Sequence, residues 1–136
     1  MIGHLLDTCI CVELLRRRPS AMLWAHLRRQ AIGTVGISAI TLAELRYGVA
    51  RSQVPEHNGL ALNQFLVPLV IATFEARAAA VYGRLRADLH QLGQPIGPLD
   101  TLIAAHALSL DAVLITSNEK EFRRVPGLVV HNWLKE

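Results

Sequence analysis

Acidic residues close to the ends of short apolar segments constrain the fold of this chain more than any other feature. The four segments that carry them are His4–Thr8, Ile40–Glu44, Pro98–Thr101 and Thr116–Glu119, spread over most of the 136 residues. If the apolar segments are parallel strands, their carboxyl ends meet in one crevice, where ligands of open α/β sheets bind. Carboxylates gathered there would repel one another unless a divalent cation neutralised them, and Mg²⁺ or Mn²⁺ suits an all-oxygen site.

Short runs rich in Val, Ile and Leu alternate with helical patterns along the whole chain. Runs without clean polar alternation are typical of strands covered on both faces. Strands are expected at Ile2–Leu6, Val35–Ser38, Leu69–Ala72, Ala112–Thr116 and Leu128–Asn132. Strands separated by helices predict right-handed crossovers and a mostly parallel sheet, so the fold class is α/β, a three-layer α/β/α sandwich.

Helical periodicity is clearest over Phe74–Leu92, where apolar residues recur at helical spacing and Gly93 provides a stop. Gln53–Asn58 is polar and is expected to be a loop. The other helices are expected at Thr8–Leu15, Ala21–Gln30, Ala39–Ser52, Gly59–Val67 and Leu99–Leu108.

Length and composition indicate one domain, residues 1–136. Hydrophobic residues make up 51% of the chain, which argues against disorder. No apolar run approaches the ~20 residues of a membrane span, and no secretory pattern is present, so a cytoplasmic protein is expected. Cys9 and Cys11 have no distant partner and predict neither a disulfide nor a zinc site.

The net charge is +3, and most of the 14 cationic residues are arginines. Guanidinium groups suit phosphate and RNA, but arginines also solvate helix faces, and the charge alone leaves both interpretations open. Arg86 stands out because it follows Tyr82 by one helical turn, close to an apolar stripe, where it would need a carboxylate or phosphate partner.

Each acid has an ordinary structural explanation beside the functional one. Asp7 could simply cap a helix, and Thr41-x-x-Glu44 has the spacing of a capping box. Against this, Glu44 has apolar neighbours, and buried acids are rare unless paired or ligated. Asp100 shares a helix face with two alanines, which favours close packing at the sheet and a functional role.

The fourth acidic segment is ambiguous. Thr116-x-x-Glu119 and Asn118-x-x-Glu121 both have cap-plus-glutamate spacing, so either glutamate could be structural and the other could supply a fourth charge. Asn118 could bind an ion weakly or orient water. His106, alone on an alanine-rich helix, is interpreted as a packed core residue rather than a general base.

Several blocks resemble the PIN-domain ribonucleases of the VapC toxin type, in the right order and spacing. The blocks are Leu6–Thr8, Ile37–Gly48, Tyr82–Ala87, Gly97–Ala107 and Phe122–Trp133. The resemblance implies a toxin of a type II toxin–antitoxin pair that cuts RNA with Mg²⁺ or Mn²⁺, and Asp7, Glu44 and Asp100 fall on the family's acidic triad. It also implies a homodimer, inhibition by a VapB-type antitoxin in the acidic groove, and promoter DNA bound only through the antitoxin.

Two positions depart from the resemblance. Cys9 stands where the family often has a polar residue, and Asn118 stands where many members carry a fourth acid. The first affects the fine positioning of the site, and the second leaves open how many metal ions bind.

The sequence therefore predicts hydrolysis of RNA phosphodiester bonds. Asp7 and Asp100 are expected to ligate the metal, Glu44 to ligate it or hold its water, and Asn118 and Glu121 to support the site. Arg86, or the pair Arg123–Arg124, could hold the RNA backbone. Two alternatives remain: a structure-specific DNA nuclease, and a catalytically weak regulatory member of an antitoxin–DNA complex. The RNA target, the oligomeric state and the antitoxin's identity are not encoded in recognisable motifs.

Overall fold

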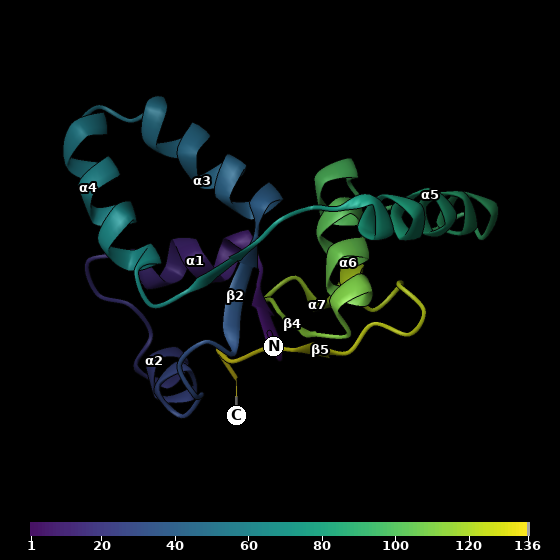
Figure 1. The fold of residues 1–136 in the computed structure, drawn as a ribbon, viewed down its shortest axis with the longest axis horizontal. Coiled ribbons are helices and arrows are strands. Elements are labelled where there is room, and N and C mark those ends of the chain that lie inside the picture. Colours follow the sequence, from purple (N-terminus) through teal and green to yellow (C-terminus); the bar gives the residue numbers. More distant parts are fainter. Residues whose placement is uncertain (136) are drawn as a thin grey trace.

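Five parallel strands form a single sheet in the computed structural model, which describes residues 1–135 (Figure 1). In the sheet they follow the order β3-β2-β1-β4-β5, and every pair is parallel. The expected mostly parallel sheet is thus confirmed, and within the described residues it is wholly parallel. The strands are β1 (His4–Leu6), β2 (Val35–Ser38), β3 (Val70–Ala72), β4 (Val113–Ile115) and β5 (Val130–His131). Each strand lies within the range expected from the sequence.

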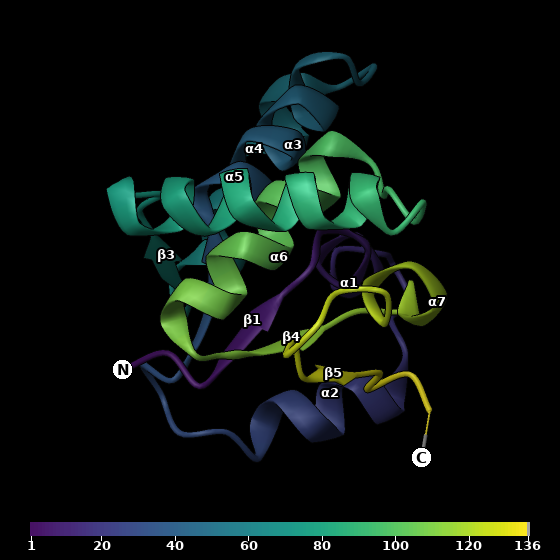
Figure 2. The same ribbon diagram turned by 90° about the vertical axis from the view of Figure 1, so that its right-hand side faces the viewer.

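Helices cover both faces of this sheet and give the three layers expected from the sequence (Figure 2). Consecutive strand residues point to opposite faces, so Leu5 and Leu6 enter different cores. The first core contains side chains of α5 (Ala76–Gln91), α6 (Pro98–Leu110) and α7 (Glu119–Phe122). The second contains side chains of α1 (Thr8–Leu14), α2 (Ala21–Arg28), α3 (Ala39–Ala50) and α4 (Pro55–Leu66).

Two local predictions differ from the structure. The polar segment Gln53–Asn58 is not a loop, because α4 already begins at Pro55. Proline at the first helical position has its φ angle fixed near the helical value, which favours a helix start despite the polar residues that follow. The helix α7 was not expected, since its four residues are too few to show periodicity. The α3–α4 hairpin projects away from the sheet beside α1 (Figure 1).

The strand order places the acidic segments together. From β1 the chain first builds β2 and β3 on one side and later β4 and β5 on the other, so the order reverses between β1 and β4. Crevices at such switch points are the ligand sites of open α/β sheets. At this one, Asp7 follows β1 and donates its backbone N–H to Ile115 O at 2.8 Å, and Thr116 follows β4. None of the helices in the described chain is long and apolar enough to span a membrane.

Candidate active site

Asp7 is buried at the end of β1, with 4% of its surface exposed. As expected for a helix cap, it precedes α1 and its Oδ1 accepts the backbone N–H of Thr8 at 2.8 Å. Its Oδ2 accepts the hydroxyl of Thr116 at 2.7 Å and lies 3.4 Å from the thiol of Cys9. A carboxylate has about four lone-pair positions, so these bonds fix its orientation and still leave capacity for a ligand.

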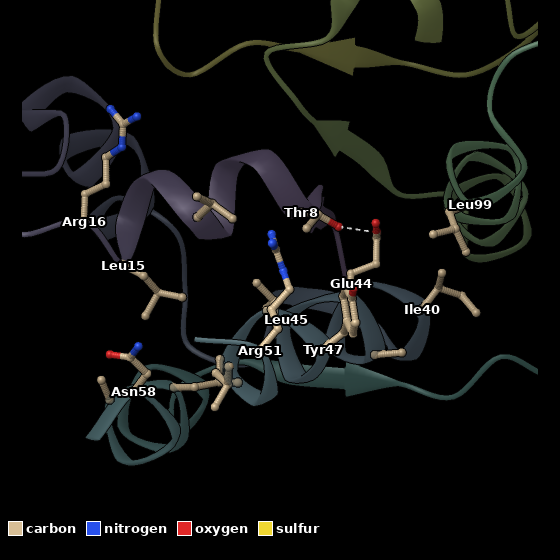
Figure 3. A pocket seen from close by; sticks show the side chains of 16 residues that line it. Thr8, Leu15, Arg16, Ile40, Glu44, Leu45, Tyr47, Arg51, Asn58 and Leu99 are labelled. Atoms are coloured by element: carbon tan, nitrogen blue, oxygen red, sulfur yellow. Dashed lines mark hydrogen bonds between the residues drawn. The ribbon is translucent and has the colours of Figure 1, made fainter. Parts of the chain in front are cut away.

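Glu44 does not form the capping box that its spacing with Thr41 suggested. The helix α3 starts at Ala39 and is capped by Ser38, whose hydroxyl accepts the N–H of Ile40 at 3.0 Å, so Glu44 lies inside the helix. Its Oε1 accepts the hydroxyl of Thr8 at 2.7 Å instead (Figure 3). Thr8 therefore connects two acids that are 37 positions apart, with its backbone N–H on Asp7 and its hydroxyl on Glu44.

Asp100 lies half-buried in the first turn of α6. Burial, followed by the negative charges of Asp7, Glu121 and Glu44, raises the pKa of its carboxyl group to about 6. Those charges act on Asp100 only because the strand ends bring all four acids to one side of the sheet. The acids that the sequence separates by up to 114 positions thus share one electrostatic environment.

The two candidate glutamates of the fourth segment have different environments. Glu119 forms ion pairs with Arg123 at 2.8 Å and Lys135 at 2.9 Å and accepts from Asn132 at 3.0 Å. These hydrogen bonds lower the pKa of Glu119 to about 2. Glu121, by contrast, is the one whose charge raises the pKa of Asp100. Glu119 is therefore held by ion pairs near the end of the described chain, whereas the charge of Glu121 acts on Asp100.

Asn118 lies at the start of α7 and its side chain makes no capping hydrogen bond there. Its backbone N–H donates to the hydroxyl of Thr116 at 3.0 Å. That hydroxyl in turn donates to Asp7, so the loop after β4 positions Asp7 through Thr116. The two threonines, Thr8 and Thr116, were not singled out from the sequence. The sequence feature that could have identified them is a hydroxyl residue near the end of a strand. Thr8 directly follows Asp7, and Thr116 directly follows β4.

Asp7, Glu44 and Asp100 form no ion pair within residues 1–135, where the acids that do so are Glu13 and Glu119. The described residues also contain no ready cluster of three His, Cys, Asp or Glu side chains close enough to enclose an ion. Mg²⁺ keeps several waters and binds through one or two carboxylates, so it does not require an all-protein cage. The donors are all oxygens and their charge is uncompensated, so the residues fit a hydrated Mg²⁺ or Mn²⁺.

The arginines proposed to bind RNA have partners within the protein, and none of these contacts indicates a phosphate site. Arg86 is exposed and donates to the hydroxyl of Tyr82 at 2.8 Å, so it needs no buried carboxylate partner. Arg123 pairs with Glu119, and Arg124 donates to the carbonyl of Pro95 at 3.0 Å. Arg86 therefore keeps the most freedom to meet a phosphate.

His106 is a core residue, as interpreted from the sequence, with 1% of its surface exposed. Its Nδ1 lies 2.7 Å from the hydroxyl of Ser38, and its ring meets that of Phe74 edge-on at 5.2 Å. Burial lowers the pKa of His106.

A groove of about 920 Å³ opens beside the acids, between α1, α3 and α4 (Figure 3). Its walls are mostly apolar and include Val12, Leu45 and Leu62. Glu44 lies in the same groove together with two arginines, Arg16 and Arg51. The groove is thus acidic near the crevice, apolar along its walls, and basic where these arginines reach it.

Comparison with known proteins identifies relatives over nearly the whole chain. A model of the PIN domain matches residues 4–128. Ribonuclease VapC2 of Rickettsia felis is 44% identical over 97% of this chain and 98% of its own. The tRNA(fMet)-specific endonuclease VapC of Shigella flexneri is 37% identical over 98% of this chain and 99% of its own. The crystal structure of VapBC2 from Rickettsia felis, bound to a DNA fragment from their promoter, contains a chain that is 42% identical with a TM-score of 0.91. The match covers 98% of this chain and 99% of that one.

Proposed function

We propose that this chain, which belongs to the PIN-domain family and is a VapC-type ribonuclease toxin, hydrolyses RNA with a divalent cation held in the crevice of Asp7, Glu44 and Asp100. The observation that carries the proposal is the convergence of distant acids: Thr8 bridges Asp7 and Glu44, and burial together with the charges of neighbouring carboxylates raises the pKa of Asp100. The chain supplies no cation to offset that charge within its described residues. A bound Mg²⁺ or Mn²⁺ would offset it.

The roles of the residues follow from their contacts. Asp7 and Asp100 would ligate the ion, and Glu44 would ligate it or hold one of its waters. Glu121 adds negative charge at Asp100, and Asn118 supports Thr116 behind Asp7. The ion would supply Lewis acidity, which acidifies water and stabilises charge on the phosphate.

The protein's own groups keep the site in place. Thr8 and Thr116 donate hydrogen bonds to Glu44 and Asp7, so both carboxylates are oriented before a substrate arrives. Preorganised groups of this kind lose no reorganisation energy during the reaction. Arg86, exposed on α5, would contact a phosphate of the RNA backbone outside the crevice. The named relatives are ribonucleases, which favours RNA over DNA as the substrate.

The test compares RNA and DNA oligonucleotides cut in Mn²⁺ by wild type, Asp7→Asn, Asp100→Asn and Asp88→Asn. Asp88 is an exposed aspartate of α5 and serves as the matched control. The metal's contribution of several kcal/mol corresponds to a loss of roughly a thousandfold in both crevice variants, with Asp88→Asn unchanged. Cleavage by Asp100→Asn at the wild-type rate would contradict the assignment, as would a preference for DNA.

A VapB-type antitoxin is the proposed partner for the groove beside the acids. The apolar walls suit an amphipathic peptide segment, and Glu44 would attract a cationic side chain carried by it. Promoter DNA would be bound only through that antitoxin. The VapBC2 complex from Rickettsia felis is itself bound to a fragment of its promoter. The implied homodimer stays a prediction, which light scattering of the toxin alone measures.

The groove assignment is tested with Val12→Asp, since Val12 is half-exposed on the wall formed by α1. We expect this variant to keep its kcat for RNA, since the crevice acids are unchanged, but to resist inhibition by the antitoxin, because a charge in an apolar interface disfavours docking. Equal inhibition of Val12→Asp and wild type would place the antitoxin elsewhere.

A further inference from the structure

An aromatic ring lies unusually exposed beside the acids. Tyr47 on α3 has 68% of its surface exposed, although it lines the same groove as Glu44 (Figure 3). Tyrosine gains most when its ring is packed against another group and its hydroxyl stays wet. A ring left open in a groove next to a catalytic crevice is therefore available to a ligand.

Arg51 covers part of this ring. Its guanidinium carbon lies 5.5 Å from the ring centroid, within the range of a cation–π contact. In the part of the chain that the structure describes, Arg51 forms no ion pair, so its charge is not offset by a carboxylate. The contact holds a cation beside the ring, and most of the ring surface stays free for a second flat group.

Tyr47 and Arg51 are also in register with Glu44 along α3. They follow it by three and seven positions, spacings that place residues on one face of a helix. At 1.5 Å per residue, the ring is displaced by about one helical turn from the acid along the axis, and the guanidinium by about two. Gly48 lies between them, and a Cβ added there would meet nothing within 4 Å, so the groove floor beside the ring is open.

We propose that Tyr47 and Arg51 form a stacking platform for an unpaired base of the RNA, next to the phosphodiester bond cut in the crevice. The base stacks on Tyr47 and Arg51 neutralises an adjoining phosphate. This inference rests on the proposed function and adds to it two residues that hold the nucleotide beside the cleaved bond. Unpaired bases are the parts of RNA that aromatic side chains and arginines bind by stacking. Bases of a continuous duplex stay stacked on each other.

The chemistry of the pair favours RNA over a peptide as the ligand of this ring. A peptide segment finds its apolar surface on the other walls, at the exposed side chains of Val12, Leu15 and Leu99. An exposed ring with a cation beside it offers the two features that a nucleotide requires, a flat π surface and a partner for phosphate. An antitoxin in the groove would then inhibit partly by covering the platform.

The experiment measures KM and kcat for a mixed-sequence single-stranded RNA carrying 2-aminopurine, and for the same strand in a duplex. The variants are Tyr47→Leu, Tyr47→Phe and Arg51→Ala, with Arg46→Ala as control. Arg46 is an exposed arginine of the same helix that donates to Asn63, outside the groove lining. Tyr47→Leu keeps an apolar side chain and removes the π surface, and Tyr47→Phe keeps the π surface and removes the hydroxyl.

We expect Tyr47→Leu to raise KM for the single strand about tenfold or more, with a smaller change in kcat, since stacking on an aromatic residue contributes that much per base. Quenching of 2-aminopurine on binding should disappear with it. Tyr47→Phe and Arg46→Ala should match wild type within about twofold. Arg51→Ala should raise KM and weaken its dependence on salt, because one phosphate contact is lost.

Several results would overturn the platform. They are failure of wild type to bind the single strand, an equal rise of KM in Tyr47→Leu and Tyr47→Phe, and an unchanged KM in Tyr47→Leu. If Tyr47→Leu binds RNA normally but binds the antitoxin weakly, the ring belongs to the peptide partner instead. The proposed function fails separately, when Asp100→Asn still cuts RNA.

Discussion

At the scale of single residues, the crevice is a set of like charges held in place by neutral donors. Thr8 and Thr116 bind the carboxylates of Glu44 and Asp7 at 2.7 Å each, yet neither brings positive charge. The repulsion therefore remains. At the half-buried Asp100, burial and then the charges of Asp7, Glu121 and Glu44 raise the pKa. A site of this kind is stable in geometry and unfavourable in electrostatic energy until a cation binds.

The first prediction is that Asp100→Asn stabilises the fold. The pKa of Asp100 rises from 3.8 to about 6 on folding, so its ionised form is disfavoured in the folded state. At ~1.4 kcal/mol per unit, and with a discount for solvent screening, the variant should gain about 1 to 2 kcal/mol at pH 8. The gain should shrink as the pH falls through about 6, where wild type takes up the proton.

Urea unfolding at pH 8 and pH 5, with and without Mg²⁺, measures this effect independently of activity. Mg²⁺ should raise the free energy of unfolding of wild type at pH 8 and should act more weakly on Asp100→Asn, since a ligand that binds only the folded state stabilises it. Asp88→Asn, altered outside the crevice, should behave as wild type. A less stable Asp100→Asn protein at pH 8 would show that the carboxylate has an unseen favourable partner.

The sequence allows the acids to be grouped but does not reveal the residues that surround them. Strand ends and helix starts are visible in the chain, so Asp7, Glu44 and Asp100 could be grouped. The contact of Thr8 with Glu44 joins residues 36 positions apart, and its existence depends on how α3 packs against α1. Glu119 and Glu121 have the same local spacing relative to possible caps. Only the fold, which brings Lys135 and Asn132 to Glu119, separates their roles.

At the scale of elements, the strands are short and the helices position the site. The strand β1 has three residues, and Asp7 at its end also starts α1, so one residue terminates one element and begins the next. Short apolar runs followed by capping residues are strong sequence signals, which is why most elements could be predicted. The start of α4 at Pro55 and the existence of α7 depend on one or two residues each, too few for periodicity to show.

The second prediction concerns two glycines inside helices. Gly48 of α3 and Gly83 of α5 have helical backbones, and a Cβ added at either would meet nothing within 4 Å. Alanine at each position should stabilise the protein by about 0.5 to 1 kcal/mol, because glycine loses more backbone entropy on helix formation. Thermal or urea unfolding measures both, and destabilisation of either would imply a clash that the free space excludes.

The same two variants form a matched pair for the groove. Gly48 lines it between Tyr47 and Arg51, and Gly83 does not. Gly48→Ala should therefore raise KM for single-stranded RNA modestly, and Gly83→Ala should leave it unchanged. Equal kinetics in the two variants would argue that no ligand approaches the backbone at Gly48.

At the scale of the whole molecule, two hydrophobic cores on opposite faces of the sheet hold the crevice at its carboxyl edge. The parallel topology could be predicted because alternating strands and helices permit few arrangements. The strand order could not, since nothing in the chain states that β4 pairs with β1 rather than with β3. That order, β3-β2-β1-β4-β5, is what brings Thr116 to Asp7.

The third prediction is a loss of global stability in mild acid that depends on His106. This residue joins three parts of the molecule: its own helix α6, Ser38 at the end of β2, and Phe74 in the segment after β3. Burial lowers its pKa, with smaller opposing effects from the Thr73 backbone and the charge of Glu75. Its neutral form is therefore favoured by folding.

The sign follows from that difference. Above pH 6.5 the ring is neutral in both states and its contribution to stability is complete. As the pH falls below 6.5, the unfolded chain takes up the proton first, so stability decreases until the pH passes the lowered pKa of the folded state.

Urea unfolding of wild type, His106→Gln and His57→Gln from pH 8 to pH 5 measures this loss of stability. His57 is an exposed residue of α4 and serves as the control. His106→Gln should be less stable at pH 8, because packing against Phe74 is lost, and should have a flatter pH dependence. The part of the pH dependence that is due to His4, whose pKa is lowered by burial and by His131, should remain in this variant. If His106→Gln and His57→Gln lose stability in parallel with wild type as the pH falls, the buried imidazole is not the group that titrates.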